Sequence, residues 1–360
     1  MNIFKKIKPM PNGSKLSATT TTSSPIANTP TVLTVTAEQQ KDKFNELNEI
    51  ESNRIIEGLN DVDSIWTVRA ALDKKNKARN RYANVSPYDR ARVKIPVVDD
   101  ATYSDYINAS YMRLETNRGS IANDYIACQG PLPATRNHFW SMCFSESEKQ
   151  GNDVIIVVMV TPLIEQGMVK CDRYWPAAGE SWDFSQKNKE EGIVYGEMEI
   201  ANVQETVDAD DDYLLTQLEL KAGEKTKKVY HFYYYKWADA KVPPSFKPLA
   251  KISNHVAQVK SYSGSGSPPV PVVHCSAGVG RSGTFMIYDH LFRDRETFKE
   301  LLDSAAAVSN KDVIYKAVAS LRSRRMMMVQ TVYQFQFLYE VARTFYEERS
   351  EDEEFCNSHK

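Results

Sequence analysis

One short loop constrains the fold of this chain more than any other segment. Residues 273–283 read Val-His-Cys-Ser-Ala-Gly-Val-Gly-Arg-Ser-Gly and join the apolar run 270–274 to apolar residues at helical spacing from Thr284 onward. Small residues allow the chain to turn tightly between the expected strand and the expected helix. The loop N–H groups then converge at the positive end of the helix, where they form a cradle for a doubly charged anion.

Three side chains of this loop predict covalent chemistry. Cys275 at the loop entrance experiences the N–H groups, the helix terminus and Arg281, a setting that lowers a thiol pKa from about 8.5 into the range of about 3.5–7.5. Its thiolate is then a nucleophile at neutral pH. Arg281 can hold two phosphoryl oxygens in its planar fork, and Ser282 can donate a hydroxyl to the thiolate when it leaves again. The loop therefore predicts a catalytic cysteine that acts on a phosphate ester.

A dinucleotide-binding fold is the alternative that the glycines suggest. Gly278, Gly280 and Gly283 fit the spacing G-x-G-x-x-G. The residues after Gly283 read as helices, however, and supply no further strand–helix–strand units for the sheet of such a fold. A dinucleotide loop also has no use for a cysteine and an arginine inside it, so we reject this alternative.

The other cysteines and the charge balance argue against several further classes. Cys128, Cys143, Cys171 and Cys356 form no C-x-x-C pair and the total of five is odd, so we expect neither a disulfide framework nor a structural zinc site. We expect these four to be small buried residues of a reduced, cytoplasmic protein with no metal and no cofactor. With 45 Lys and Arg against 47 Asp and Glu, the chain lacks the positive excess that nucleic-acid binding needs. No stretch reaches the ~18 apolar residues of a membrane span.

The pattern along the chain predicts one large domain with polar ends. Residues 1–36 are rich in Ser, Thr and Pro and are expected to be a disordered tail, with the acidic residues 349–360 as a second tail. Between them, 37–348 combines strand and helix patterns and is expected to be an α/β (α+β) catalytic domain. The expected helices are 37–59, 284–302, 311–325 and 332–348, and the expected strands are 154–160, 213–220, 228–235 and 270–274.

Further motifs place the cysteine loop in a family. The loop resembles the signature of the protein tyrosine phosphatases of the Cys-x5-Arg type, and the chain is similar to them over residues 45–345. In pattern it most resembles the small soluble, non-receptor tyrosine phosphatases of yeasts. The resemblance implies the tyrosine-phosphatase fold, a highly twisted mixed β-sheet flanked by helices. The motifs that carry it are Arg79–Tyr82, Asp105–Ser110, Tyr125–Pro131, Lys170–Pro176, Trp237–Asp239, and Gln330 with Thr331 and Gln334.

The resemblance implies a two-step reaction. Cys275 would attack phosphorus to give a phosphocysteine, and Asp239 in a mobile flap would protonate the leaving tyrosine and then act as base on water. Gln330 would orient that water, with Gln334 beside it. For the two glutamines, an exposed helix face is the alternative interpretation.

The family pattern also implies supporting residues. His274 would hold the loop by hydrogen bonds, because Asp239 already fills the role of base. Glu165 would pair with Arg281, or else lie at the surface by chance. Tyr82 and Val85 would sandwich the aryl ring of the substrate. The remaining substrate contacts would come from Ser276, Ala277, Gly278, Val279, Gly280, Asn84 and Trp237.

The implied activity is hydrolysis of phosphotyrosine on proteins, in signalling. One alternative is a catalytically weak phosphotyrosine-binding module, which the presence of Cys275, Arg281 and Asp239 disfavours. Another is a phosphoinositide phosphatase, which usually carries extra basic residues in the loop, whereas this loop has no Lys. The implied partners are phosphotyrosine-containing proteins.

Overall fold

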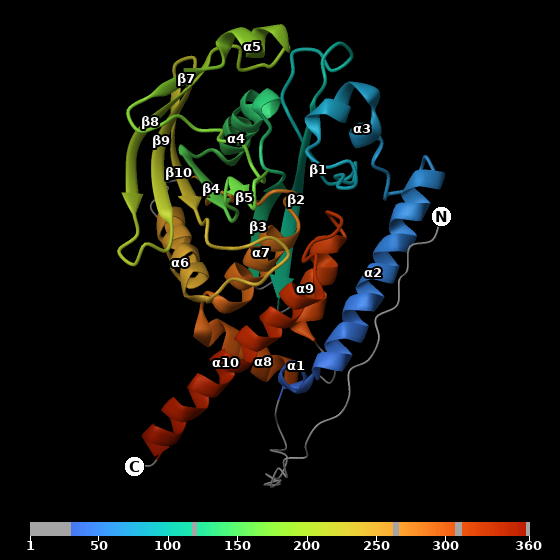
Figure 1. Cartoon of the computed structure of the whole chain (residues 1–360), viewed down its shortest axis with the longest axis vertical. Helices are drawn as coiled ribbons and strands as arrows, with labels where there is room; N and C mark the ends of the chain where they lie inside the picture. The colour runs from blue at the N-terminus through green and yellow to red at the C-terminus, as the bar shows by residue number, and fades with distance from the viewer. Residues whose placement is uncertain (1–29, 117–120, 262–265, 307–311, 358–360) are drawn as a thin grey trace.

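The computed structural model describes residues 30–116, 121–261, 266–306 and 312–357, which fold around a nine-stranded sheet (Figure 1). The strand order is β1-β2-β3-β11-β4-β10-β9-β8-β7. β11 pairs in parallel with β3 and β4, β10 pairs in parallel with β4, and the other pairs are antiparallel, so the predicted mixed sheet is confirmed. The strands are β1 (Arg92–Lys94), β2 (Tyr106–Thr116), β3 (Ile121–Cys128), β4 (Val154–Met159), β7 (Ser181–Asp183), β8 (Met198–Val207), β9 (Leu214–Ala222), β10 (Lys225–Tyr233) and β11 (Val272–His274). A separate hairpin pairs β5 (Ile164–Glu165) with β6 (Met168–Val169).

Helices cover both faces of this sheet. Successive residues of the apolar strand β4 point to opposite faces: Val157 packs in one cluster with Trp140 of α4, and Val158 packs in the other with Phe285 of α7. Burial on both faces explains why the strand reads as a continuous apolar run. The helices are α1 (Thr31–Thr34), α2 (Ala37–Asn60), α3 (Arg69–Leu72), α4 (Arg136–Gln150), α5 (Ser185–Glu190), α6 (Lys247–Ser261), α7 (Gly280–Phe292), α8 (Arg295–Ala306), α9 (Val313–Arg322) and α10 (Val332–Asn357), with short 3₁₀ turns at Lys74–Arg79 and Pro133–Thr135. In the described part of the chain, no helix is both long and apolar enough to cross a membrane.

The strand–loop–helix unit around the cysteine lies at the centre of the molecule. β11 ends at His274 between β3 and β4, and α7 begins at Gly280. The loop 275–279 therefore leaves the sheet at the carboxyl end of its central parallel strand, where open sheets containing parallel strands commonly bind ligands.

The structure corrects three expectations about element boundaries. The predicted helix 284–302 is two helices, because Asp294 accepts the N–H of Thr297 at 2.8 Å and so begins a second helix. The predicted tail 1–36 is wrong at its end, since α1 lies within it and Val32 and Val35 are buried in the core. At the other end, α10 continues through Asn357 rather than giving way to a tail at 349. The expectations for residues 1–29 and 358–360, and for the side chain of Cys356, lie outside the described residues.

Candidate active site

The carbonyl groups of the cysteine loop are all bound by the surrounding protein. Gly130 N–H donates to Ser276 O at 2.8 Å, and Val329 N–H donates to Val279 O at 3.1 Å. The fully buried Arg325 donates to Ala277 O at 2.9 Å and to Gly278 O at 3.0 Å. Among the described residues, the N–H groups of residues 276, 277, 278 and 280 donate to no other protein group. Because its carbonyls are bound from outside, the loop keeps these donors for a ligand, which is the cradle that the sequence predicts.

Gly278 is required by this loop geometry. Its φ is +71°, in the region that favours glycine, and a Cβ atom there would lie 1.9 Å from the carbonyl oxygen of Cys128. No side chain fits at this position without moving the end of β3. The glycine pattern that resembled a dinucleotide motif thus has a different cause, the close approach of this loop to a neighbouring strand.

Cys275 differs in its electrostatics from three other buried cysteines. Burial raises the pKa of its thiol, but the charge of Arg281, the hydroxyl and N–H of Ser282 and the N–H of Val279 outweigh burial, and the net pKa is lowered. Burial raises the pKa of Cys128 to about 12 and raises that of Cys143 and Cys171 above the usual range. Cys275 is therefore the cysteine of this group whose surroundings favour the thiolate.

His274 supports the loop from behind. Its Nδ1 lies 2.9 Å from Cys275 O, and its Nε2 lies 2.6 Å from the hydroxyl of Tyr174, which in turn lies 2.7 Å from His231 Nε2. Burial lowers the pKa of His274 to about 4, so the ring is neutral at physiological pH. A neutral ring bound on both sides fits the predicted holding role and does not fit a general base. Tyr174 is a further member of this network that the sequence did not single out.

Arg281 connects the cradle to the flap. Its side chain is 1% exposed, and one terminal nitrogen donates to the carbonyl of Trp237 at 2.8 Å while lying 3.7 Å from Glu165 Oε2. The other terminal nitrogen lies 3.2 Å from Asp239 Oδ1. Of the two interpretations of Glu165, the structure supports pairing with Arg281. Glu165 also accepts the backbone N–H of Asp239 with both carboxylate oxygens, at 2.9 and 3.1 Å, a contact that the sequence did not reveal.

Asp239 lies between two cations. Its Oδ2 accepts a hydrogen bond from Lys170 Nζ at 2.8 Å, whereas its other oxygen, Oδ1, is the one near Arg281. Burial raises the pKa of the Asp239 carboxyl, but the hydrogen bond from Lys170 and the charges of Arg281 and Lys170 outweigh it, and the net pKa is lowered. Lys170 was part of a predicted motif but had no predicted role. Its only sequence signal was its place at the start of that motif.

The flap backbone is held by a tryptophan. Trp237 is fully buried, and its indole N–H donates to the carbonyl of Lys241 at 2.9 Å. Ala240, which follows Asp239, has a φ of +55°, a conformation that is uncommon for a residue with a side chain. The flap is therefore a tight turn that projects the Asp239 carboxylate toward Arg281.

Tyr82 and Val85, the residues expected to sandwich the aryl ring and here called the pocket wall, differ in their contacts with the cradle. The hydroxyl of Tyr82 lies 2.7 Å from Ser276 Oγ, and Ser276 Oγ donates to the carbonyl of Lys170 at 2.5 Å. Val85 is buried, whereas Asn84 is exposed and its side chain makes no hydrogen bond to a described residue. The structure therefore brings Tyr82 to the cysteine loop and leaves the side chain of Asn84 exposed to solvent.

The two glutamines occupy different environments. Gln334 is 1% exposed; its Oε1 accepts the N–H groups of Gln330 and Thr331 at 3.1 and 3.3 Å, and its Nε2 donates to Lys241 O at 3.4 Å. Gln330 precedes α10 and is exposed. A Cβ placed on Gly280 would lie 3.0 Å from Gln334 Oε1 and 3.2 Å from Gln330 Cβ, so both side chains lie over the start of α7. The alternative of an exposed helix face does not hold for Gln334.

The segment before Gln330 is strained and held from α2. Met327 and Val329 have φ values of +63° and +58°, which are unusual for residues with large side chains. Glu51 of α2 accepts the N–H of Met327 at 2.8 Å. The buried Arg322 donates to the carbonyls of Met328 and Val329 at 3.0 and 3.1 Å. Helix α2, far upstream in the sequence, thus holds the segment that precedes Gln330. No local sequence pattern could indicate this contact.

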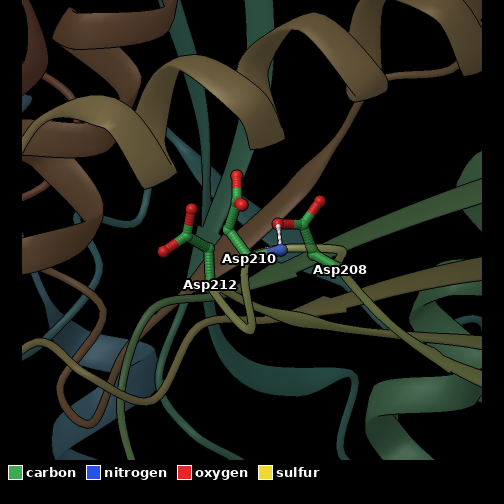
Figure 2. A group of neighbouring side chains, drawn as sticks. All are labelled: Asp208, Asp210 and Asp212. Atoms are coloured by element: carbon green, nitrogen blue, oxygen red, sulfur yellow. Dashed lines mark hydrogen bonds between the residues drawn. The ribbon is translucent and has the colours of Figure 1, made fainter.

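One acidic cluster outside this site has a simple explanation. Asp208, Asp210 and Asp212 bring carboxylate oxygens within 4.8 Å of one another, and Asp210 N–H donates to Asp208 at 3.2 Å (Figure 2). Lys251 Nζ lies 3.0 Å from Asp208 and 2.9 Å from Asp212 and also contacts Asp210. The lysine contacts all three carboxylates and offsets part of their negative charge.

Comparisons with known proteins agree with the geometry of the site. The family model described as protein-tyrosine phosphatase matches residues 76–344. The chain is 36% identical over 323 residues to tyrosine-protein phosphatase 1 of Saccharomyces cerevisiae, covering 84% of this chain and 92% of that protein. It is 32% identical over 301 residues to tyrosine-protein phosphatase 1 of Schizosaccharomyces pombe, covering 83% of this chain but only 50% of that longer relative. The solved catalytic domain of human protein tyrosine phosphatase non-receptor type 18 superposes with a TM-score of 0.65 at 26% identity, over 85% of this chain and 96% of that one.

Proposed function

The chain belongs to the protein-tyrosine phosphatase family, and from this premise we propose that it hydrolyses phosphotyrosine on proteins through a phosphocysteine on Cys275. The observation that carries the proposal is the pairing of a cysteine of lowered pKa with a loop whose N–H groups are left for a ligand. Donors held in place before the reaction stabilise the charge that develops on a transferring phosphoryl group.

In the first step, the thiolate of Cys275 forms an S–P bond as the P–O bond to the tyrosine breaks. The electron pair of the broken bond stays on the phenolic oxygen, which takes the proton of Asp239. Asp239 must therefore be protonated in the complex, although Lys170 and Arg281 lower its pKa in the protein alone. A bound phosphate dianion neutralises Arg281 and removes one of these influences. Substrate binding therefore raises the pKa of the acid that the step needs.

In the second step, water attacks the phosphocysteine. Asp239, now a carboxylate, takes a proton from the water, and Gln330 orients the water, supported by the bond from its N–H to Gln334. The S–P bond breaks, inorganic phosphate leaves, and the electron pair returns to Cys275. The Ser282 hydroxyl and the N–H groups that lower the Cys275 pKa stabilise this leaving thiolate.

The proposed substrates are phosphotyrosine segments of proteins. One of the solved neighbours, PTPN18, was determined in complex with HER2 phosphopeptides. Tyr82 beside the cradle supplies an aromatic wall for the phenol ring. We further propose that the enzyme acts in signalling in the cytoplasm, where its free cysteines stay reduced. We also propose that the catalytic domain includes α1 and α2.

The test is turnover of a phosphotyrosyl peptide beside a phosphoinositide, by the wild type, Cys275→Ser and Asp239→Ala. The proposal expects hydrolysis of the peptide, little hydrolysis of the lipid, at least a 10²-fold loss in kcat with Asp239→Ala and no turnover with Cys275→Ser. A faster reaction with the phosphoinositide, or residual turnover by Cys275→Ser within tenfold of the wild type, would overturn it.

A further inference from the structure

The β5–β6 hairpin beside the flap carries apolar side chains that the protein does not bury. Ile164, Met168 and Val169 are 62%, 56% and 52% exposed, although the whole hairpin is the short segment 164–169. In the part of the chain that the structure describes, none of the three belongs to an apolar cluster or packs against one, whereas the neighbouring Leu163 does. Exposed apolar side chains that gather in one place mark a surface that another molecule covers.

The turn of the hairpin determines which side chains share a face. Both central residues of this turn have positive φ values, +49° and +77°, as a two-residue turn of type I′ requires. Glu165 pairs with Met168 across the turn, and Ile164 pairs with Val169. Paired residues of an antiparallel ladder lie on the same face, and successive residues lie on opposite faces. Met168 therefore shares a face with Glu165, while Ile164 and Val169 lie on the other face.

The face that carries Met168 is the face of the catalytic site. Glu165 accepts the backbone N–H of Asp239 at 2.9 and 3.1 Å. The ladder continues by one pair to Lys170, whose N–H donates to the opposite strand at 2.8 Å, so Lys170 also lies on this face. Its ammonium group binds the Asp239 carboxylate at 2.8 Å. Met168 thus lies beside both side chains that hold the flap, and its own side chain is exposed.

The substrate is the molecule expected at this position. In the proposed reaction, Asp239 contacts the phenolic oxygen of the phosphotyrosine, so the tyrosine ring lies beside the flap. The next residue of the substrate begins only about 3.8 Å along its chain, within reach of a side chain that lies next to the flap. On this face, the charges of Glu165 and Lys170 already bind the flap, so the side chain that remains for a ligand is the apolar one of Met168.

We propose that Met168 binds a large apolar side chain that flanks the phosphotyrosine in the substrate. The proposal rests on the proposed function, because the phosphotyrosine in the cradle anchors the substrate segment. A methionine side chain is unbranched and polarizable, so it adapts to apolar partners of different shapes. The contact removes apolar surface of both partners from water and needs no charge. Met168 thus selects among phosphotyrosine sites and takes no part in the chemistry.

The test is a set of phosphotyrosyl peptides in which a single Leu occupies each position from four before to four after the phosphotyrosine, with Gln at the other positions. The values of kcat/KM are compared for the wild type and for Met168→Gln, which exchanges the thioether for an amide of similar length. The matched control is Val169→Thr, which makes the neighbouring side chain polar at similar volume, on the opposite face of the hairpin. p-Nitrophenyl phosphate, which has no flanking residue, reports the intrinsic activity.

The proposal expects one or two positions where Leu raises kcat/KM about three- to fivefold over Gln in the wild type. The preference should disappear in Met168→Gln and persist in Val169→Thr. It should also survive high salt, which screens charges but does not weaken apolar contacts. Activity toward p-nitrophenyl phosphate should stay within twofold of the wild type in both variants. A Leu preference that survives in Met168→Gln, or its absence at every position in the wild type, would overturn the proposal.

Two further results separate a failure of this proposal from other causes. If Met168→Gln lowers kcat by the same factor with p-nitrophenyl phosphate and with every peptide, Met168 supports the flap instead of the substrate, and the proposal is wrong. If no peptide is hydrolysed at all, the proposed function fails. Met168 is then judged by fluorescence anisotropy of the same peptides with Cys275→Ser, and equal affinity for the Leu and Gln peptides would reject its role.

Discussion

The ammonium group of Lys170 lies 2.8 Å from Oδ2 of Asp239 and ties the flap to a residue whose carbonyl accepts the hydroxyl of Ser276 in the cysteine loop. The contact has two effects: it holds the flap beside Arg281, and it lowers the pKa of the carboxyl that we propose as the proton donor. The same side chain therefore stabilises this position of the flap and limits the pH range in which Asp239 could act as the proposed acid.

Replacing Lys170 should separate these two effects. In Lys170→Met, the pKa of Asp239 rises because a hydrogen bond and a positive charge are lost. A higher pKa keeps the acid protonated to higher pH, so the decline of kcat on the basic side of the pH profile should move to higher pH. The maximum kcat should fall, because the flap loses its tether. The measurement is the pH dependence of kcat with p-nitrophenyl phosphate.

Two control variants test whether this effect is specific to the charge of Lys170. Lys170→Arg keeps the charge and should leave the basic limb near its wild-type position. Lys149→Met removes a lysine that pairs with Glu146 on α4, away from the flap, and should have no effect on the profile. A basic limb that stays in place or moves to lower pH in Lys170→Met would show that Lys170 does not set the pKa of Asp239.

Gly278→Ala should lower the free energy of unfolding by more than the strain of a positive φ alone accounts for. The added Cβ would lie 1.9 Å from the carbonyl oxygen of Cys128, so the loop or the end of β3 must move. Gly223→Ala is the matched control, because Gly223 has a φ of +57° but no atom within 4 Å of the added Cβ. We expect Gly223→Ala to cost about 1 kcal/mol in the free energy of unfolding and Gly278→Ala at least about 3 kcal/mol, with a loss of kcat only in the latter. Equal costs in urea unfolding would show that the close approach to Cys128 is not a constraint.

Glu51→Ala should slow the second chemical step. The variant removes the acceptor of the Met327 N–H, so the strained residues before Gln330 lose their tie to α2. We expect the free energy of unfolding to fall by about 1–3 kcal/mol. In rapid-mixing kinetics, the initial burst of tyrosine product should keep its rate while the steady-state rate falls.

Glu51→Gln is the control for this prediction, since its side-chain oxygen can still accept the Met327 N–H. It should retain most of the steady-state rate. If Glu51→Ala slows the burst and the steady state by the same factor, α2 supports the site as a whole and does not act through Gln330.

The sequence predicted the cradle geometry because its residues are close together in the chain. Cys275, Arg281 and Ser282 lie within eight residues in one strand–loop–helix unit, and the roles that we propose for them follow from that spacing. The contacts of Lys170 and Glu51 depend on segments that meet only in the folded molecule. Neither the tie between Lys170 and the flap nor the tie between α2 and the Gln330 segment leaves a local pattern.

The errors in the element boundaries have similar causes. Apolar residues continue at helical spacing through Asp294, and only the side-chain bond to Thr297 N–H reveals a break there. Val32 and Val35 are surrounded by Ser, Thr and Pro, so composition placed them in a tail although both are buried. In each case, a single tertiary or capping contact decides the structure, although the composition or spacing of the neighbouring residues predicts something else.

The cysteine comparison makes a prediction about alkylation. The pKa of Cys275 is lowered, whereas that of Cys128 is raised to about 12. Iodoacetate at pH 6.5 should therefore modify Cys275 first, with loss of activity in step, and inorganic phosphate should protect it by filling the cradle. Peptide mapping by mass spectrometry identifies the modified residue. Inactivation that tracks Cys128 or Cys171 would mean that the surroundings of Cys275 do not favour its thiolate.

The most direct test of the covalent mechanism is rapid acid quenching of the wild type with a phosphotyrosyl peptide, followed by mass spectrometry of the digested protein. The account predicts a phosphoryl adduct on the peptide that contains Cys275, formed in step with the first equivalent of tyrosine product. The adduct should accumulate further in Gln330→Ala and be absent in Cys275→Ser. Tyrosine product that forms at the wild-type rate with the phosphoryl group on another residue, or on none, would contradict a phosphocysteine at Cys275.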